Sequence, residues 1–362
     1  MRLLKTTHID TSSAEDTANP DKNDHYVSRG VAQECDHPSS SLGRLFDARD
    51  YISNESFVVG YCRRCKLYVT SPTPSEQSIA KFYPAGYYGT GSTGKRFTPA
   101  VEMLLGILYD FRVRQISKDR KPGKVLDIGC GRGLLLDRLR KRGWDPVGTE
   151  LSETSASYAR DVLHLPVITK PFEEIGFKDG EFDLVILWHV LEHIHQPLPM
   201  LKEIGRILKP GGTLLVAVPN FGSWEAKMGR KGWFHLDVPR HLTHFTPRTL
   251  RRALNEVDMT ISGTNFFSSE YDFYSFVQTV QNKMGLHHNL LYNLLRTRSA
   301  KVLEENGDVT NISTFEILIS LLSAVPLALI SLLYAPFVAA VGQGATMAVY
   351  AVKREDIREY KR

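Results

Sequence analysis

The residues of this sequence that most directly predict chemistry are glycines and acids clustered between positions 125 and 150. Val125 to Ile128 runs into Gly129-Cys130-Gly131-Arg132-Gly133, and a helical run from Leu134 to Lys141 follows. Glycines let the backbone approach a ligand closely, and a helix start offers free N–H groups. Asp127 precedes the turn, and Glu150 ends the next apolar segment, where a carboxylate can accept hydrogen bonds from both ribose hydroxyls. The pattern therefore predicts a strand, a tight turn and a helix that bind a nucleoside.

The third glycine separates this turn from one that binds a dinucleotide. The dinucleotide pattern GxGxxG would place a glycine at Leu134, whereas here it comes one residue early, at Gly133. This spacing opposes a nicotinamide oxidoreductase. The stretch VLDIGCGRG resembles motif I of class I S-adenosylmethionine-dependent methyltransferases. The resemblance implies a cofactor site formed by Asp127, Gly129, Cys130, Gly131, Gly133, Glu150, Leu151, Phe172 and Trp188. In it the aspartate and glycines would hold the amino-acid end, Glu150 the ribose, and Phe172 and Trp188 the adenine.

Landmarks further along the chain extend the resemblance over roughly residues 120–260. Glu181 to Leu187 is apolar enough for a buried parallel strand, and Lys209-Pro210-Gly211-Gly212 ends a helical run and starts a strand at Thr213. Residues 345–352 resemble the last strand of the same family. We therefore expect an α/β fold with a Rossmann-like, doubly wound, mostly parallel seven-stranded sheet and a final antiparallel strand.

Two groups of histidines are candidates for a general base, which methylation of a hydroxyl requires. His241 and His244 lie in the loop after the fifth strand, which covers the acceptor pocket in this family, and they are our first choice. His189, at the end of the fourth strand, is the second. Either loop histidine could instead hydrogen-bond a backbone carbonyl without a chemical role.

The stretch around His189 also resembles the metal-binding segment of O-methyltransferases in quinone biosynthesis. That segment reads acid-x-x-acid-His, and this chain has His189, Glu192 and His193 at those positions. Because a histidine replaces the first carboxylate, we do not expect a divalent cation there. Capping and packing beneath the site are the alternative roles of Glu192 and His193.

A second candidate metal site lies near the N-terminus. Cys62 and Cys65 form a CxxC pair between β-rich segments, and two thiolates at this spacing can bind one tetrahedral zinc. The segment resembles the zinc ribbon attached to many bacterial methyltransferases, whose second CxxC is here replaced by Cys35-Asp36-His37-Pro38. The resemblance implies a structural zinc held by Cys35, His37, Cys62 and Cys65. The alternative is a ribbon that has lost its metal and is held by packing.

The C-terminal region carries a long apolar segment. No charged residue lies between Glu316 and Lys353. We expect Pro326 and Pro336 to divide residues 317–341 into shorter pieces, forming a hairpin that dips into one leaflet. Basic residues around the leucines of 283–301 predict an amphipathic helix on an anionic membrane surface. The alternative is a helical cap or a homodimer interface.

Composition and segment boundaries complete the prediction. The net charge of +5 over 362 residues does not by itself indicate nucleic acid, and we expect none as a partner. Few cysteines and no apolar signal sequence favour the cytoplasm, with peripheral or monotopic attachment at the inner face of the membrane. A helix over residues 98–118 should bury an apolar face that includes Leu104, Phe111 and Ile116. The expected parts are a disordered tail (1–30), a zinc-ribbon-like module (31–72), a linker with this helix (73–122), the methyltransferase domain (123–270 and 343–354) and a helical insertion (271–342).

The function that this sequence favours is O-methylation. The expected acceptor is a saccharide, a lipid-linked intermediate or another small metabolite, brought close by the apolar segment. A soluble dimer that methylates nitrogen or carbon of a free small molecule is one alternative. A non-catalytic scaffold that binds the cofactor is another.

Overall fold

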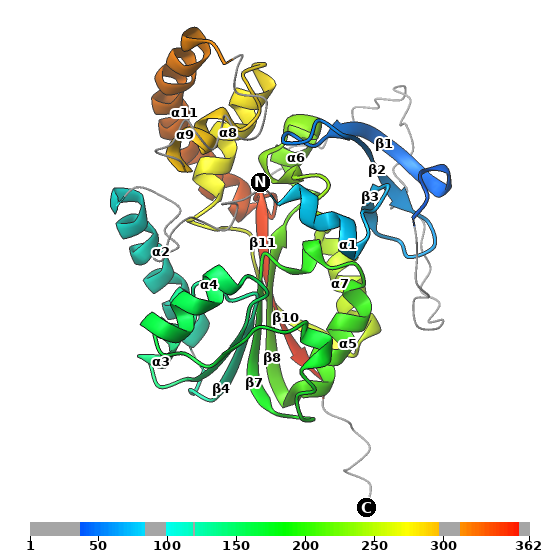
Figure 1. Cartoon of the computed structure of the whole chain (residues 1–362), viewed down its shortest axis with the longest axis vertical. Helices are drawn as coiled ribbons and strands as arrows, with labels where there is room; N and C mark the ends of the chain where they lie inside the picture. The colour runs from blue at the N-terminus through cyan, green and yellow to red at the C-terminus, as the bar shows by residue number, and fades with distance from the viewer. Residues whose placement is uncertain (1–36, 84–98, 119, 297–311, 355–362) are drawn as a thin grey trace, which may run out of the picture. The chain divides into compact units, whose positions relative to one another are not determined.

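The computed structural model of the protein describes residues 37–83, 99–118, 120–296 and 312–354. Its larger sheet has seven strands in the order β10-β11-β8-β7-β4-β5-β6 (Figure 1). The strands are β4 (Lys124–Ile128), β5 (Asp145–Thr149), β6 (Val167–Ile168), β7 (Phe182–Trp188), β8 (Leu208–Pro219), β10 (Met259–Asn265) and β11 (Thr346–Lys353). The strands from β6 to β8 pair in parallel, and β11 pairs antiparallel with β8 and with β10. The predicted fold class is confirmed, including the antiparallel last strand.

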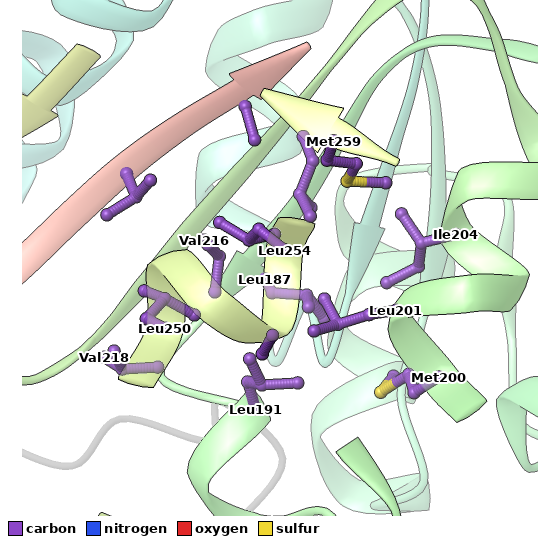
Figure 2. Close-up of a cluster of buried hydrophobic side chains, with 14 of the residues drawn as sticks. Leu187, Leu191, Met200, Leu201, Ile204, Val216, Val218, Leu250, Leu254 and Met259 are labelled. Atoms are coloured by element: carbon purple, nitrogen blue, oxygen red, sulfur yellow. The ribbon is translucent and has the colours of Figure 1, made fainter. Parts of the chain in front are cut away.

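The strands are apolar on both faces because helices cover both. Along β8, Leu214 and Val216 pack into one buried cluster, whereas Leu215 and Ala217 pack into the other. The first cluster also holds side chains from α5 (Pro197–Ile207) and α7 (Pro247–Glu256), and Figure 2 shows its centre. This alternation is what two covered faces require of a parallel sheet.

The opposite face of the sheet is covered by helices that come just before or after β4 and β5 in the chain. Buried side chains of α2 (Pro99–Ser117), α3 (Leu134–Arg140) and α4 (Glu153–Ser157) form the second cluster with the sheet. The expected apolar face of α2 is confirmed at Ile116, which is fully buried, but was wrong at Leu104 and Phe111, which are 52% and 47% exposed. The C-terminal half of α2 carries its buried residues Arg112, Val113 and Ile116, and Val113 and Ile116 pack in the second cluster. Leu104 lies in the N-terminal half, and Phe111 lies on the exposed side of the helix.

A smaller antiparallel sheet has the strand order β1-β2-β3-β9. Its strands are β1 (Leu42–Arg49), β2 (Ser56–Cys62), β3 (Tyr68–Ser71) and β9 (Thr243–His244). The strand β9 belongs to the loop after β8, so the N-terminal strands share a sheet with the loop that the sequence places over the acceptor pocket. Short helical segments complete these regions: η1 (Ser39–Ser41), α1 (Glu76–Ile79), η2 (Ala80–Phe82), η3 (Tyr158–Val162), η4 (Phe172–Glu174), η5 (Leu191–His193), α6 (Trp224–Gly229), η6 (Arg230–Gly232) and η7 (Phe234–Leu236).

The C-terminal apolar segment is one continuous helix, α11 (Thr314–Ala340), so the predicted division at its prolines was wrong. The helix begins with a capping box between Ser313 and Glu316, and both Pro326 and Pro336 lie inside it. A proline removes one N–H, but its φ is helical, and no glycine or charged residue interrupts the run from 317 to 341. A leaflet hairpin turning within this segment is therefore excluded.

The predicted basic amphipathic helix over 283–301 was also wrong in the part that the structure describes. Two helices occur there, α8 (Asp272–Lys283) and α9 (Leu290–Arg296), and the left-handed Gly285 (φ 85°) lies between them. Leu290 and Leu291 are buried rather than available to a membrane. The helix α8 packs between α11 and α6, and its polar residues, not a basic face, make the contacts described below.

Candidate active site

The turn between β4 and α3 is built by three glycines in the left-handed region. Gly129, Gly131 and Gly133 have φ values of 71°, 56° and 69°, which side chains disfavour. The N–H groups of Gly129 and Cys130 donate to the Thr149 carbonyl at 2.8 and 3.0 Å. These bonds tie the turn to the end of β5, where the next acid begins.

Glu150 lies against the glycine turn, as the sequence predicts. One carboxylate oxygen accepts from the Gly131 N–H at 2.9 Å, and the other accepts from the Ser152 N–H at 2.7 Å. Leu151, the next residue, is 71% exposed. The acid and the turn thus meet in one place, at the carboxyl ends of β4 and β5.

The space above the turn differs at each glycine. A Cβ on Gly129 would lie 2.7 Å from Val190, and one on Gly133 would lie 2.7 Å from Leu165. A Cβ on Gly131 would meet no described atom within 4 Å. Gly129 and Gly133 are therefore required because a side chain would collide with neighbouring residues. Gly131 instead leaves open space beside the turn, which a bound cofactor can occupy.

This contrast predicts different outcomes for two alanine substitutions. Gly131→Ala should lower the free energy of unfolding by only about 1–2 kcal/mol, the cost of its left-handed backbone, while weakening S-adenosylmethionine binding at least roughly tenfold. Gly129→Ala should lower the melting temperature more, because the new methyl collides with Val190. Calorimetric titration and thermal melts of both variants measure this. An unchanged dissociation constant for Gly131→Ala would contradict the prediction.

A buried aspartate and a buried arginine lie near enough beside the turn for their charges to interact. Asp127 is 3% exposed, and burial raises its pKa to about 7; Glu150 adds to the rise, whereas Arg112 opposes it. Arg112, on α2, lies over the Trp188 ring at 3.7 Å and is paired with Glu270. An acid and a guanidinium here match the ammonium and carboxylate of a bound amino acid. The sequence pattern does not single out Arg112, because the spacing in α2 marks only its apolar residues.

The other predicted cofactor residues have different surroundings. Trp188 ends β7 and is covered by Arg112, and Cys130 lies in the turn, half-buried. Phe172 is 7% exposed and belongs to the core cluster of α5 and α7, with its ring 6.3 Å from Phe177. Its side chain therefore packs inside the domain rather than standing beside the turn.

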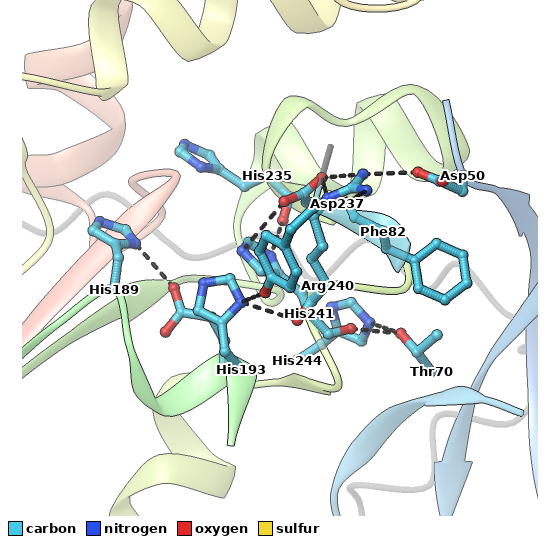
Figure 3. Close-up of polar contacts among 12 residues, drawn as sticks. Asp50, Thr70, Phe82, His189, His193, His235, Asp237, Arg240, His241 and His244 are labelled. Carbon is cyan, nitrogen blue, oxygen red and sulfur yellow. Dashed lines mark hydrogen bonds and ion pairs between the residues drawn. The ribbon is translucent and has the colours of Figure 1, made fainter. Parts of the chain in front are cut away.

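His189 lies at the carboxyl end of β7, two residues beyond the pairing of Leu187 with Ile128 at the glycine turn. Its backbone is left-handed (φ 54°), and its Nδ1 lies 3.1 Å from Glu192 Oε1 (Figure 3). Its Nε2 is buried and has no hydrogen-bond partner among the described residues. Tyr271, just before α8, packs its ring 4.6 Å from the His189 ring.

Glu192 fixes the orientation of the His189 ring and the ring nitrogen that carries its proton. Burial would raise the pKa of Glu192, but the hydrogen bond to His189 and the nearby His193 and His241 lower it to about 2. The ionised carboxylate accepts a hydrogen bond from the His189 Nδ1–H, so the Nε2 lone pair of His189 is left available. A buried, oriented and unpartnered imidazole nitrogen suits a general base.

The two loop histidines are engaged with the protein. His241 Nδ1 donates to the His235 carbonyl at 2.8 Å, and burial lowers its pKa to about 4. His244 Nε2 donates to the Thr70 hydroxyl at 2.9 Å, and that hydroxyl donates to the His241 carbonyl at 2.7 Å. Burial lowers the pKa of His244 to about 3. His244 thus joins the loop to the N-terminal sheet, and it is less suited to proton transfer than His189.

Two clusters of metal-ligating groups occur in the described residues. Glu192, His193 and His241 bring their ligand atoms within 4.8 Å of one another, and His189 is not in this set. His37, Cys62 and Cys65 form the other, with His37 Nε2 3.1 Å from Cys65 Sγ. Cys35, the fourth predicted zinc ligand, lies outside the described residues. Three predicted ligands therefore converge, in a donor set that zinc prefers.

Comparison with known proteins identifies the domain. The profile of a family described as "Methyltransferase domain" matches residues 105–262. A ubiquinone biosynthesis O-methyltransferase of Coxiella burnetii is 31% identical over 156 residues, which are 41% of this chain and 66% of that protein. A protein of the same name from Methylococcus capsulatus is 33% identical over 103 residues, 27% of this chain and 44% of that protein.

Residues 105–262 form a class I S-adenosylmethionine-dependent methyltransferase domain. The chain spans two thirds or less of the length of these curated relatives. A solved methyltransferase from Archaeoglobus fulgidus is 18% identical with a TM-score of 0.43, covering 68% of this chain and 94% of that one. One from Mesorhizobium loti is 12% identical with a TM-score of 0.39, covering 67% and 95%.

Proposed function

We propose that the protein transfers a methyl group from S-adenosylmethionine to a hydroxyl oxygen, with His189 as the general base. The observation that carries this proposal is the buried, unpartnered His189 Nε2 beside the glycine turn. Relatives named O-methyltransferases support oxygen as the nucleophile. The proposed acceptor is a saccharide, a lipid-linked intermediate or another small metabolite.

Each group of the site has a defined task in this proposal. When bound, S-adenosylmethionine supplies a methyl group on a positively charged sulfur, which leaves as a neutral thioether. Glu150 would hold the ribose hydroxyls, and Asp127 and Arg112 would hold the amino-acid end. His189 Nε2 takes the hydroxyl proton while the oxygen–methyl bond forms and the sulfur–methyl bond breaks. Glu192 stabilises the resulting imidazolium through the Nδ1 hydrogen bond.

The proposal is tested with methyl-labelled cofactor. The purified chain is incubated with labelled S-adenosylmethionine and separate polar and lipid extracts of the source cells. We expect label in a product that resists mild acid and base, as an ether does, and no label with the Glu150→Ala variant. Label recovered only in N-methyl or C-methyl products would replace the oxygen acceptor. Absence of cofactor binding by calorimetry would remove the proposal altogether.

We also propose that His37, Cys62 and Cys65, with Cys35, bind one structural zinc. The turn that presents the two cysteines supports this: the Cys62 N–H donates to the Leu67 carbonyl, and the Lys66 N–H donates to the Cys62 carbonyl at 2.7 Å. Four protein ligands leave no open position, so this zinc would stabilise the small sheet and take no part in catalysis.

Metal analysis of cysteine variants tests this site. We expect about one zinc per chain in protein from zinc-supplemented medium, loss of zinc in Cys65→Ser, and a lower melting temperature after chelation. Cys130→Ser is the matched control, because its cysteine lies in the glycine turn away from this cluster. Equal zinc content in Cys65→Ser and Cys130→Ser would contradict the site.

A further inference from the structure

The outer side of α11 is an apolar surface that the described protein does not cover. The helix has 27 residues, and only 11% of its most apolar window is buried. The buried positions are Ser320, Ser331, Ala335 and Val338, which follow one narrow stripe. At about 100° per residue, the exposed apolar side chains cover an arc of about 200°. They are Phe315, Leu318, Leu321, Leu322, Val325, Leu329, Ile330, Leu332, Leu333, Phe337 and Val341.

The buried stripe fixes α11 to the rest of the fold. Gln281 of α8 donates to the Ser320 carbonyl at 2.7 Å and accepts from the Ser320 hydroxyl at 3.1 Å. The ring of Phe276 in α8 packs against that of Tyr334 at a tilt, with ring centroids 4.4 Å apart. Figure 1 shows α8, α9 and α11 as neighbouring helices. The helix α8 packs along the buried stripe of α11 and also packs on α6. If α11 crossed a bilayer, it would therefore have to break its contacts with α8 or bring α8 into the lipid.

Exposed basic and aromatic groups border the C-terminal end of this surface. Trp224 of α6 is 44% exposed, and its ring lies 6.0 Å from Phe337 of α11. Lys227, also on α6, reaches Gln343 at 3.4 Å. Arg230 and Lys231 follow directly in η6, and all three basic residues are exposed; the Arg230 guanidinium lies 5.9 Å from the centre of the Phe46 ring of β1. Tryptophan at the edge of an apolar surface, with cations beside it, matches the boundary between acyl chains and anionic headgroups.

We propose that α11 docks the protein on an anionic phospholipid bilayer, lying in the plane of the interface with its outer side in the acyl layer. We call Trp224, Lys227, Arg230 and Lys231 the basic rim; these residues would meet the headgroups. A second copy of the chain is the competing occupant. A helix-pairing seam needs an apolar stripe of roughly 100°, so a dimer would leave much of this arc in water, whereas lipid covers all of it. The inner leaflet of the cell membrane, which carries anionic lipid, is the proposed location.

The helix α8 connects the docking surface to the proposed acceptor site. The helix α8, which carries α11 on one side, begins directly after Tyr271, whose ring packs against His189. Docking therefore holds this wall of the site close to the bilayer. The inference goes beyond the proposed methyl transfer, and vesicle binding tests it without any acceptor.

Vesicle flotation with the full chain tests the proposal. We expect the protein to float with vesicles of phosphatidylglycerol and phosphatidylethanolamine and much less with phosphatidylcholine. Charge reversal of the basic rim (Lys227→Glu, Arg230→Glu, Lys231→Glu) should weaken binding at least roughly tenfold, because each cation contributes about 1 kcal/mol near an anionic surface. The matched control reverses three exposed basic residues elsewhere: Arg142→Glu, Lys178→Glu and Lys202→Glu. Equal binding of the two triple variants would overturn the role of the rim.

Substitutions on α11 test the apolar surface itself. Leu329 and Leu333 point away from the buried stripe and are 63% and 80% exposed, so glutamates there should abolish flotation without lowering the melting temperature. Leu45→Glu with Val162→Glu is the control, since both residues are exposed on other elements. Flotation equal to the parent would overturn the proposal. The proposal would also be overturned if the parent chain did not bind vesicles, was a dimer by light scattering, and became a monomer in the α11 variant. Cofactor titration of each variant separates a docking defect from a failed active site.

Discussion

Replacing His189 with glutamine should lower kcat for methyl transfer by about 10²–10⁴-fold, the usual contribution of a general base. The affinity for S-adenosylmethionine should change little, because His189 receives the acceptor proton and does not hold the cofactor. Glutamine keeps a polar group of similar length in the buried site but cannot take the proton. Steady-state kinetics and cofactor calorimetry on the same preparation measure both quantities.

The neighbouring histidine and carboxylate provide the controls for this prediction. His195 Nε2 donates to the Pro74 carbonyl at 2.8 Å, outside the cluster around His189, so His195→Gln should retain near-parental kcat. Glu192→Gln should reduce kcat less than His189→Gln, because the amide still orients Nδ1 but no longer stabilises the imidazolium. A raised KM with unchanged kcat would assign His189 to acceptor binding instead.

Local sequence was sufficient for the parts of the site that one βαβ unit supplies. The spacing of Gly129, Gly131, Gly133 and Glu150 predicts a turn and an acid that meet, and backbone hydrogen bonds from Gly131 and Ser152 to Glu150 show why they do. The order of apolar runs likewise predicts the parallel sheet and the returning strand β11. In each of these cases, the residues that interact lie within one or two elements of each other.

Contacts between distant segments could not be predicted in the same way. Arg112 reaches Trp188 from α2, and Tyr271 reaches His189 from the start of α8. His244 was interpreted as facing the acceptor crevice, but Thr70, 174 positions away, holds it in the small sheet. The continuity of α11 was missed for a different reason. Pro326 and Pro336 predict breaks in the helix, but no glycine, asparagine or aspartate lies between Ile317 and Val341 to form a turn there.

A buried arginine connects the N-terminal module to the loop after β8. Arg240 is fully buried and donates to Asp50 at 2.8 Å, to Asp237 at 2.8 Å and to the Phe82 carbonyl at 2.9 Å (Figure 3). Asp50 is 1% exposed. Asp50 directly follows β1, Phe82 ends η2, and Asp237 lies in the loop before β9, so one guanidinium holds together segments far apart in the chain.

Replacing Arg240 with methionine should lower the free energy of unfolding by about 3–5 kcal/mol, because it leaves the buried Asp50 and the partly buried Asp237 without their cation. Methionine keeps most of the side-chain volume, so the loss reports charge and hydrogen bonds rather than a cavity. Chemical denaturation at pH 7 measures the change. Arg142→Met, at an exposed position, is the control and should cost less than about 0.5 kcal/mol.

The pH dependence of the stability loss in Arg240→Met distinguishes loss of charge from simple loss of packing. Burial would raise the pKa of Asp237, but Arg240 and His241 lower it to about 2. In the parent, this depressed pKa contributes stability above about pH 4, the ordinary aspartate value, and that stability is lost as pH falls toward about 2. Without the guanidinium, burial favours the protonated form of Asp237, so the stability deficit of Arg240→Met should shrink as pH is lowered from 7 to 4. A deficit that is independent of pH would show that packing of the arginine stem, and not its charge, connects the two regions.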